Sequence, residues 1–464
     1  MHLHFIGICG TAMGNVALMM RAAGHTVTGS DQNIYPPMSD LLAEAGVAIM
    51  TGFSPDNLDP APDLVVIGNR MSRGNDEVEA ALDRKLPYIS LPELLKRELI
   101  QGRSSVVLTG THGKTSTSSL MAWMLECAGR SPNFMIGGVP GNFQAGWQYR
   151  PDSDLVVLEG DEYDTAFFDK RSKFVHYLPT ALVINNIEFD HADIFGSLDD
   201  IMLSFRRLVN IVPSNGIILA NGDDPNAVAA AAGAFTPVET FGLGEGCTWR
   251  AMNIEYGADA TSFDIARDGI VEARISSTLL GEFNVRNALG VAAIGRWLGV
   301  GYETIDRAFS SFINTKRRLE LKGEFRGVKV YDDFAHHPTA IRETLRALRL
   351  RHPSERLWAV FEPRSNTTRR NVFQWELAES FFEVDRVLLA QVDRLEELPQ
   401  EERLDPEKLT GDLRDRDIDA RFLPDADRIV EYLRDHAEAG DVIAVMSNGG
   451  FDGIHPKLAA ALRG

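Results

Sequence analysis

Short apolar runs that end in glycine or polar residues recur along the chain and alternate with helical patterns. Residues 3–6 form one such run, a glycine-rich turn follows, and apolar residues at helical spacing occupy 16–23. The alternation predicts parallel strands joined by helices, with ligand-binding turns at the carboxyl ends of the strands. Further strands are predicted at 25–28, 64–69, 87–91, 106–108, 154–158, 181–186, 328–331, 357–361, 387–390 and 442–446.

The length of 464 residues predicts about three domains. We expect an α/β protein with a Rossmann-like N-terminal domain over 1–102 and a central P-loop ATPase domain with a mostly parallel sheet over 103–314. A Rossmann-like α/β domain is expected over 315–464. We interpret the charged run at 393–421 as a solvated loop or helix face.

Composition narrows the class of protein. A hydrophobic content of 44% and a charged content of 24% are typical of globular proteins. Nucleic acids and anionic membranes bind basic surfaces, so the net charge of -19 argues against both partners. The chain has three cysteines without a close pair and no apolar run of membrane-spanning length. We therefore predict a cytoplasmic protein without membrane insertion, whose oligomeric state the sequence leaves open.

The clearest chemical signal follows the strand at 106–108. Its turn and helix start consist of Gly110, Thr111, His112, Gly113, Lys114, Thr115 and Ser116. Backbone N–H groups in such a turn, with the helix dipole, bind phosphate. Lys114 would reach the β- and γ-phosphates of a nucleotide, and the Thr115 hydroxyl would bind Mg²⁺. Leu108 stands where the full P-loop pattern has glycine, and the alternative is an ordinary strand–helix turn.

Polar residues after two later strands and in a helix extend this candidate site. Glu159 directly follows the strand at 154–158, where a Mg²⁺-binding acid is expected beside a phosphate loop. His191 lies among acids after the strand at 181–186. The alternatives are a solvated acidic loop and a structural histidine. Asn284 and Asn287 are three residues apart and would share one helix face, holding an adenine edge or metal waters, unless Asn284 only caps the helix.

The first glycine turn predicts a second nucleotide site. Its spacing is G-x-x-G-x-x-x-G, which does not match the dinucleotide fingerprint, so a nucleoside diphosphate is favoured over a nicotinamide cofactor. An acid after the second strand would bind a ribose hydroxyl. The alternative for the polar residues after the third strand is an ordinary loop. The candidates are Gly7, Gly10, Thr11, Gly14, Asp31, Asn69, Arg70 and Ser72.

Seven motifs, in one order along the whole chain, resemble the Mur ligase family of ATP-dependent amide-forming enzymes of peptidoglycan synthesis. They are GICGTAMG, GTHGKTS, LEGDEYD, FDHAD, GEFNVRNALG, KRRLE and YDDFAHHPT. The resemblance implies three domains that bind a UDP-sugar, ATP and the incoming amine. It also implies that the first glycine turn and Asp31 contact the UDP-sugar, and that Glu159 and His191 bind metal. Asn284, Asn287, Arg318, Asp333 and His337 would surround ATP and the reacting groups.

Within the family, FDKRSKFVHY, EPRSNT and MSNGGF resemble the branch that joins the tripeptide L-Ala-γ-D-Glu-meso-diaminopimelate to UDP-N-acetylmuramate in wall recycling. The nearest alternative is the branch that adds free L-alanine. A nicotinamide oxidoreductase and a nucleotide-gated regulatory protein are the alternatives from other classes.

The implied chemistry activates the sugar's carboxylate as an acyl phosphate, which the peptide amine then attacks. Lys114, Arg318 and Mg²⁺ would screen the anions. His337 or Asp333 would accept the amine proton, and the sequence does not choose between them. Arg364, Asn366, Ser447 and Asn448, after two strands of the third domain, would bind the peptide carboxylates. The alternative for Arg364 is an ATP contact or domain closure.

Overall fold

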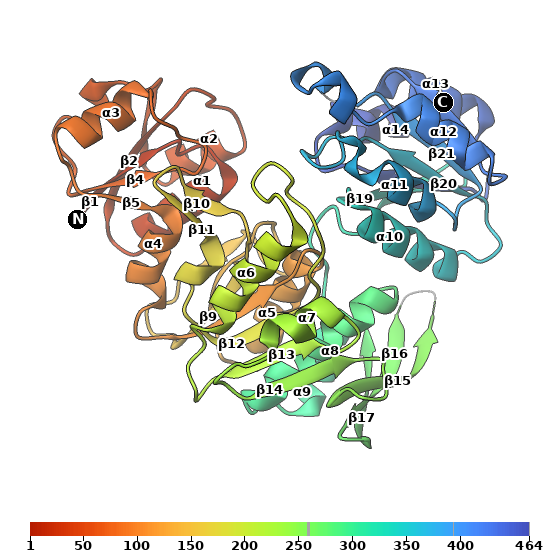
Figure 1. Cartoon of the computed structure of the whole chain (residues 1–464), viewed down its shortest axis with the longest axis horizontal. Helices are drawn as coiled ribbons and strands as arrows, with labels where there is room; N and C mark the ends of the chain where they lie inside the picture. Colours follow the sequence, from red (N-terminus) through yellow and green to blue (C-terminus); the bar gives the residue numbers. More distant parts are fainter. Residues whose placement is uncertain (258–259, 393, 464) are drawn as a thin grey trace.

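The structure is a computed structural model, and it describes residues 1–257, 260–392 and 394–463. Over these residues the strands form three large sheets and one two-stranded sheet, and each large sheet comes from one continuous stretch of sequence. In Figure 1 the first and last units lie on either side at the top, and the central unit lies below and between them. This arrangement confirms the predicted α/β fold.

The first unit is a five-stranded parallel sheet in the order β3-β2-β1-β4-β5. The carboxyl ends of β1, β2 and β4 meet at one edge, as the glycine turn after β1 requires. The sequence interpretation missed β3. The strands are β1 (His2–Ile6), β2 (Thr26–Asp31), β3 (Ala48–Thr51), β4 (Leu64–Ile67) and β5 (Tyr88–Ser90), and the helices are α1 (Thr11–Ala22), α2 (Met38–Glu44), α3 (Asp76–Asp83) and α4 (Leu91–Leu95).

The central sheet has the order β17-β16-β15-β14-β13-β12-β6-β9-β7-β8. It is parallel from β15 to β7 and antiparallel at both edges. Its strands are β6 (Ser104–Thr109), β7 (Asn133–Met135), β8 (Trp147–Gln148), β9 (Leu155–Gly160), β12 (Pro179–Ile184), β13 (Ile217–Asn221), β14 (Val238–Gly242), β15 (Trp249–Tyr256), β16 (Thr261–Arg267) and β17 (Ile270–Ser277). Its helices are α5 (Lys114–Cys127), α6 (Leu198–Val209), α7 (Pro225–Ala231), α8 (Glu282–Trp297) and α9 (Tyr302–Ser310).

Apolar side chains project from both faces of this sheet and pack against the helices that cover each face. Along β6, Val107 points into one core and Val106 and Leu108 into the other. The core that contains Val107 continues into the first unit, where it includes Leu3 and Phe5. The first two units therefore share one apolar core.

The third sheet has the order β18-β19-β23-β20-β21-β22, parallel except for β18. The antiparallel edge and the strand β22 within the charged run were not predicted, and residue 393, where that run begins, lies outside the described residues. The strands are β18 (Glu320–Phe325), β19 (Val328–Asp333), β20 (Leu357–Phe361), β21 (Arg386–Ala390), β22 (Asp419–Leu423) and β23 (Val442–Met446). The helices are α10 (Pro338–Arg351), α11 (Gln374–Ser380), α12 (Pro406–Arg414), α13 (Ala426–His436) and α14 (Ile454–Arg463).

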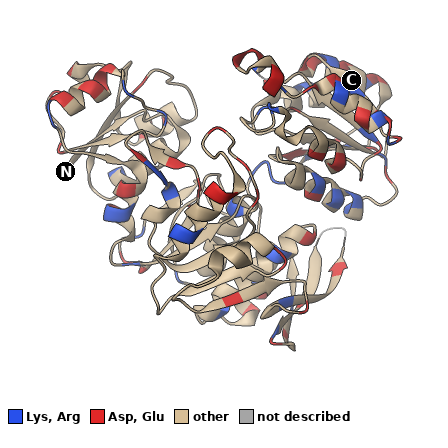
Figure 2. Ribbon diagram, viewed as in Figure 1, with Lys and Arg blue, Asp and Glu red and all other residues tan. Residues whose placement is uncertain are grey.

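Charged side chains lie mainly on the helices and loops, as Figure 2 shows, and basic residues recur along α10. Within the described part of the chain, every helix is too short or too polar to cross a lipid bilayer.

Candidate functional site

The phosphate loop connects β6 to α5 and requires its two glycines. Gly110 has φ 137° and Gly113 has φ 83°, a region that side chains with a Cβ rarely occupy. A Cβ on Gly113 would lie 2.8 Å from the amide oxygen of Asn287, and one on Gly110 would lie 3.0 Å from the Cβ of Asn185. The loop therefore packs closely against neighbouring asparagines and leads directly into the N-terminus of α5, where anions bind favourably.

Lys114 and His191 converge on one buried carboxylate, that of Glu162. The Lys114 Nζ donates to both Glu162 oxygens at 2.9 and 2.8 Å, and the His191 Nε2 lies 2.9 Å from Oε1. Burial would lower the pKa of Lys114 and of His191, but Glu162 raises both. Two basic side chains at a phosphate loop make this position suited to negative charge. The sequence interpretation did not select Glu162, because a cluster of acids does not reveal which one points inward.

Thr115 and Glu159 supply oxygen atoms beside the loop. The Thr115 hydroxyl donates to Glu159 Oε1 at 2.8 Å, and the Gly137 N–H donates to Oε2 at 2.7 Å. Arg318, from the segment that joins α9 to β18, donates to the Thr115 hydroxyl oxygen at 3.3 Å. A hydroxyl and a carboxylate in contact are the hard oxygen ligands that Mg²⁺ prefers.

Asn284 and Asn287 share one face of α8, as their spacing predicts. The Asn287 amide donates to Asn284 Oδ1 at 3.1 Å, and the Asn284 amide donates to the Leu280 carbonyl at 2.8 Å. Gly281 is the N-cap residue of this helix, without a side-chain cap. Asn284 therefore does not cap the helix.

A cavity of about 890 Å³ lies where the three units meet. Ala12 and Leu91 reach it from the first unit, and Asp333 and His336 reach it from the third. The residues selected from sequence that line it are Thr111, His112, Gly113, Lys114, Thr115, Ser116, Glu159, His191, Asn284, Asn287, Arg318 and Asp333.

Asp333 and His337, the two candidate proton acceptors, are both engaged with the protein. The Asp333 carboxylate accepts from the Leu319 N–H at 2.7 Å and the Ala335 N–H at 2.8 Å, and burial raises its pKa. It thus holds the turn that carries Arg318. The His337 Nε2 lies 3.1 Å from the Phe189 carbonyl oxygen. Of the described histidines in this motif, His336 lines the cavity and His337 does not.

The candidate sugar-binding residues gather at the carboxyl edge of the first sheet. Asp31 Oδ2 accepts from the Cys9 N–H at 2.9 Å, so this carboxylate fixes the backbone of the glycine turn. A Cβ on Gly14 would lie 2.2 Å from the Met38 sulfur, which explains glycine at this helix crossing. Gly7 lies in the turn, Gly10 and Thr11 begin α1, and Asn69, Arg70 and Ser72 follow β4.

Three of the four candidate peptide-binding residues lie together at the ends of β20 and β23. Arg364 pairs with Glu362 at 3.5 Å, and the Ser447 hydroxyl donates to the same carboxylate at 2.5 Å. The Asn448 Oδ1 is buried and accepts no hydrogen bond within the described part of the chain. Asn366 instead donates across the unit boundary to Asp193 at 2.9 Å.

Arg317, which the sequence interpretation passed over, connects this region to the cavity. It donates to the carbonyl oxygens of Ser447 and Gly449 at 2.6 and 2.7 Å. Arg317 lines the cavity, whereas the cavity wall, as far as the structure describes it, includes none of the four candidate peptide-binding residues. The KRRLE motif contains Arg317 as well as Arg318, but two adjacent arginines in a sequence do not show in which direction each side chain points.

Comparison with known proteins identifies the class to which this fold and site belong. The model of the Mur ligase family, catalytic domain, matches residues 2–102, that of the Mur ligase middle domain matches 108–295, and that of the Mur ligase, glutamate ligase domain, matches 317–449. The chain belongs to the Mur ligase family, which confirms the resemblance found in the sequence.

Individual relatives place the chain within this family. It is 44% identical over 464 residues to the UDP-N-acetylmuramate–L-alanyl-gamma-D-glutamyl-meso-2,6-diaminoheptandioate ligase of Escherichia coli K12, covering 100% of this chain and 98% of the relative. The UDP-N-acetylmuramate–L-alanine ligase of Caldanaerobacter subterraneus is 32% identical, covering 96% and 95%. The crystal structure of a murein peptide ligase from Psychrobacter arcticus matches with a TM-score of 0.72 and 39% identity, covering 100% and 99%.

Proposed function

We propose that this chain is an ATP-dependent ligase that joins the tripeptide L-Ala-γ-D-Glu-meso-diaminopimelate to UDP-N-acetylmuramate and forms a C–N bond in peptidoglycan recycling. The observation that carries the proposal is the 44% identity to a tripeptide ligase over the whole chain, against 32% to an L-alanine ligase over a similar length. Because both matches span all three units, the difference does not arise from one shared domain.

The cavity supports this reaction because it brings cations to the place where anions must meet. Attack of a carboxylate on the γ-phosphate of ATP, and attack of the amine on the resulting acyl phosphate, both need negative charge to be screened. Lys114 and Arg318 lie at the phosphate loop, where they would provide this screening. Lys114 would exchange its Glu162 partner for phosphate oxygens, and Asn284 and Asn287 would border the nucleotide.

The residues present fit Mg²⁺. The Thr115 hydroxyl and the Glu159 carboxylate are in contact at 2.8 Å, and His191 faces the same loop through Glu162. Thr115, Glu159 and His191 would hold the ion. Bound there, Mg²⁺ supplies charge neutralisation at the phosphate oxygens.

The remaining assignments follow from the positions of the candidate residues. The carboxyl edge of the first sheet, with Asp31 and the glycine turn, would bind the UDP-sugar, and the third unit, with Arg364 and Asn448, would bind the peptide. The domain bounds 1–102, 103–314 and 315–464 and a cytoplasmic location stay predictions.

Release of ADP tests the proposal. UDP-N-acetylmuramate and ATP are offered with L-alanine, with L-Ala-γ-D-Glu or with the tripeptide in separate reactions. We expect kcat/KM for the tripeptide to exceed that for L-alanine by at least about ten-fold, since one charge-assisted contact accounts for that much. Omission of the sugar should abolish ADP release. A nucleotide-gated regulatory protein would release ADP without the sugar. Equal or better use of L-alanine would assign the chain to the L-alanine branch.

A further inference from the structure

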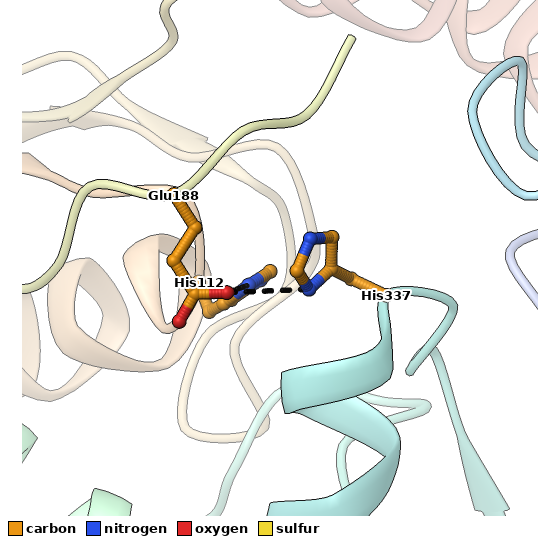
Figure 3. A group of neighbouring side chains, drawn as sticks. All are labelled: His112, Glu188 and His337. Carbon is orange, nitrogen blue, oxygen red and sulfur yellow. Dashed lines mark ion pairs between the residues drawn. The ribbon is translucent and has the colours of Figure 1, made fainter. Parts of the chain in front are cut away.

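A group of three side chains lies at the phosphate loop, and the reaction steps set out under the proposed function assign no role to it. Figure 3 shows His112 of the loop, Glu188 of the segment after β12 and His337 at the start of α10 pointing toward one another. His112 and Glu188 belong to the central unit, and His337 belongs to the third. The group therefore lies across the boundary between two units.

Two of the three distances in this group match those between ligand atoms of a metal centre. The Glu188 Oε2 is 3.4 Å from His112 Nε2 and 3.4 Å from His337 Nδ1, and the three atoms lie within 4.8 Å of one another. Tetrahedral coordination with bonds of about 2.0–2.1 Å places neighbouring ligand atoms about 3.3–3.4 Å apart. The two distances to Glu188 therefore already fit an ion, and the two imidazoles would close around it.

The surroundings orient the ligand atoms inward. The His337 Nε2 lies 3.1 Å from the Phe189 carbonyl oxygen, which accepts a hydrogen bond from Nε2–H. The proton is therefore on Nε2, and the Nδ1 lone pair faces Glu188. The Thr339 hydroxyl donates to Glu188 Oε2 at 2.7 Å, while the Thr339 N–H makes only a long 3.3 Å contact to His337 Nδ1 that an ion would replace. The His112 Nε2 is buried, and no described residue offers it a hydrogen bond.

We propose that His112, Glu188 and His337 form a binding site for a divalent transition-metal ion of the Zn²⁺ type between the central and third units. Two imidazoles and one carboxylate are a Zn²⁺ donor set with a fourth position left open. The set differs from the hydroxyl and carboxylate oxygens at Thr115 and Glu159, which suit Mg²⁺.

The three ligands come from two units, His112 and Glu188 from the central one and His337 from the third. An ion bound here would fix the third unit against the phosphate loop.

The test uses Co²⁺ as a spectroscopic probe of the full-length, EDTA-treated protein without nucleotide. Tetrahedral Co²⁺ with nitrogen ligands gives an intense visible band, whereas octahedral Co²⁺ in an oxygen-rich site absorbs weakly. We expect one equivalent of Co²⁺ to give the intense band and one equivalent of Zn²⁺ to remove it.

Two variants from different units locate the ion. Glu188→Gln keeps an acceptor for Thr339, and His337→Gln removes the ligand of the third unit; each should weaken Co²⁺ binding by at least about ten-fold. His25→Gln is the matched control, and it should keep wild-type affinity. His25 pairs with Glu98 at 3.5 Å, and among the described residues it belongs to no group of three metal-binding side chains. His191→Asn, which alters the candidate Mg²⁺ site, should keep the band.

A weak octahedral spectrum would overturn the proposal. So would unchanged affinity in both Glu188→Gln and His337→Gln, or loss of the band in His191→Asn, which would place the ion at the nucleotide site. Circular dichroism and thermal unfolding of the metal-free variants show whether each is folded. If one ligand variant does not fold, the affinity of the other decides the outcome.

Discussion

Lys114 already has an anionic partner before any nucleotide binds. Glu162 is 2% exposed and holds Lys114 and His191 on its two sides. A buried carboxylate that lost both cations would be strongly destabilised, so the three groups act as one unit. A nucleotide that binds at this loop would therefore exchange one anion for another.

Lys114→Ala should abolish ligation and leave UDP-sugar binding unchanged. Loss of one preorganised contact to a charge that develops in the transition state costs about a hundred- to a thousand-fold in kcat. The UDP-sugar candidates lie in another unit, so their affinity should not change. ADP release and calorimetric titration with UDP-N-acetylmuramate measure the two quantities. Lys170→Ala is the control, because Lys170 is 70% accessible on the strand β11 (Asp169–Ser172). Retained turnover in Lys114→Ala would show that the loop is not the ATP site.

Arg364→Ala should raise the tripeptide KM by at least about ten-fold, with the ATP KM little changed. A charge-assisted contact to a carboxylate contributes about 1.5–3 kcal/mol, or about ten- to a hundred-fold in affinity. Arg364 pairs with Glu362 and packs over Gly449, which keeps its guanidinium near the ends of β20 and β23. Steady-state kinetics with each substrate varied measures the effect, and Arg428→Ala on the exposed face of α13 is the control. A rise confined to the ATP KM would favour the alternative role of Arg364 at the nucleotide.

Sequence reasoning placed the loop residues at the turn before α5, as the structure has them, because glycine and lysine spacing encodes a local turn. It did not find Glu162, Arg317 or His336, since their roles depend on which way a side chain points after distant segments have packed. Gly160 is another such case. A Cβ there would lie 2.3 Å from the Thr109 methyl group, so the glycine reflects a cross-strand contact that periodicity does not report.

Helix α10 begins with a histidine whose protonation couples the helix to pH. His337 is its N-cap residue and accepts from the Thr339 N–H at 3.3 Å. Burial, followed by His112, lowers the pKa of His337 from 6.5 to about 3. Between these two pH values the unfolded chain binds a proton that the folded chain does not, so stability is present above pH 6.5 and declines as the pH falls.

His337→Asn should make this decline shallower. The asparagine removes the titrating group and is still able to cap the helix. One proton of difference corresponds to a slope of at most about 1.4 kcal/mol per pH unit. Urea unfolding in EDTA at several pH values between 6.5 and 5 measures the slope. Glu188, whose pKa falls from 4.5 to about 2 on folding, contributes only at lower pH. Equal slopes in both proteins would contradict the prediction.

Elements with a strong apolar pattern were predicted almost to the residue, as at β20 and β23. Some of those that were missed are short or lie at an edge. Strand β18 consists of intermediate and exposed residues and contains Gly323, and the hairpin of β10 (Asp164–Ala166) and β11 is largely polar. Such strands are held by pairing with a neighbour, and hydrophobic periodicity does not record that contribution.

At the scale of the whole molecule, two loops connect the central and third units. The Thr367 hydroxyl donates to Asp190 at 2.8 Å, and Asn366 and Tyr163 both donate to Asp193. Thr367 and Asp190 are buried. Together with the contact of Ser119 to Thr315 at 2.9 Å, these bonds hold the third unit over the phosphate loop.

Thr367→Val should loosen this connection. Loss of the hydroxyl leaves a buried carboxylate short of one donor, which costs about 1–3 kcal/mol. We expect faster amide exchange at 189–195 and 364–369 and a lower kcat, with ATP binding retained. Thr410→Val is the matched control, because Thr410 is equally buried but bonds within α12. Exchange that rises equally throughout the third sheet would indicate general destabilisation and would contradict a local role.

The continuity of each sheet in sequence has a consequence for biosynthesis. The strands of the first sheet end at Ser90, those of the central sheet run from Ser104 to Ser277, and those of the third begin at Glu320. Domains fold in turn during translation, so the first two units can close their shared core before the third unit has been synthesised. A nascent chain then carries the phosphate loop without Arg318, so, if Arg318 has its proposed role, nucleotide consumption would wait until translation is nearly complete.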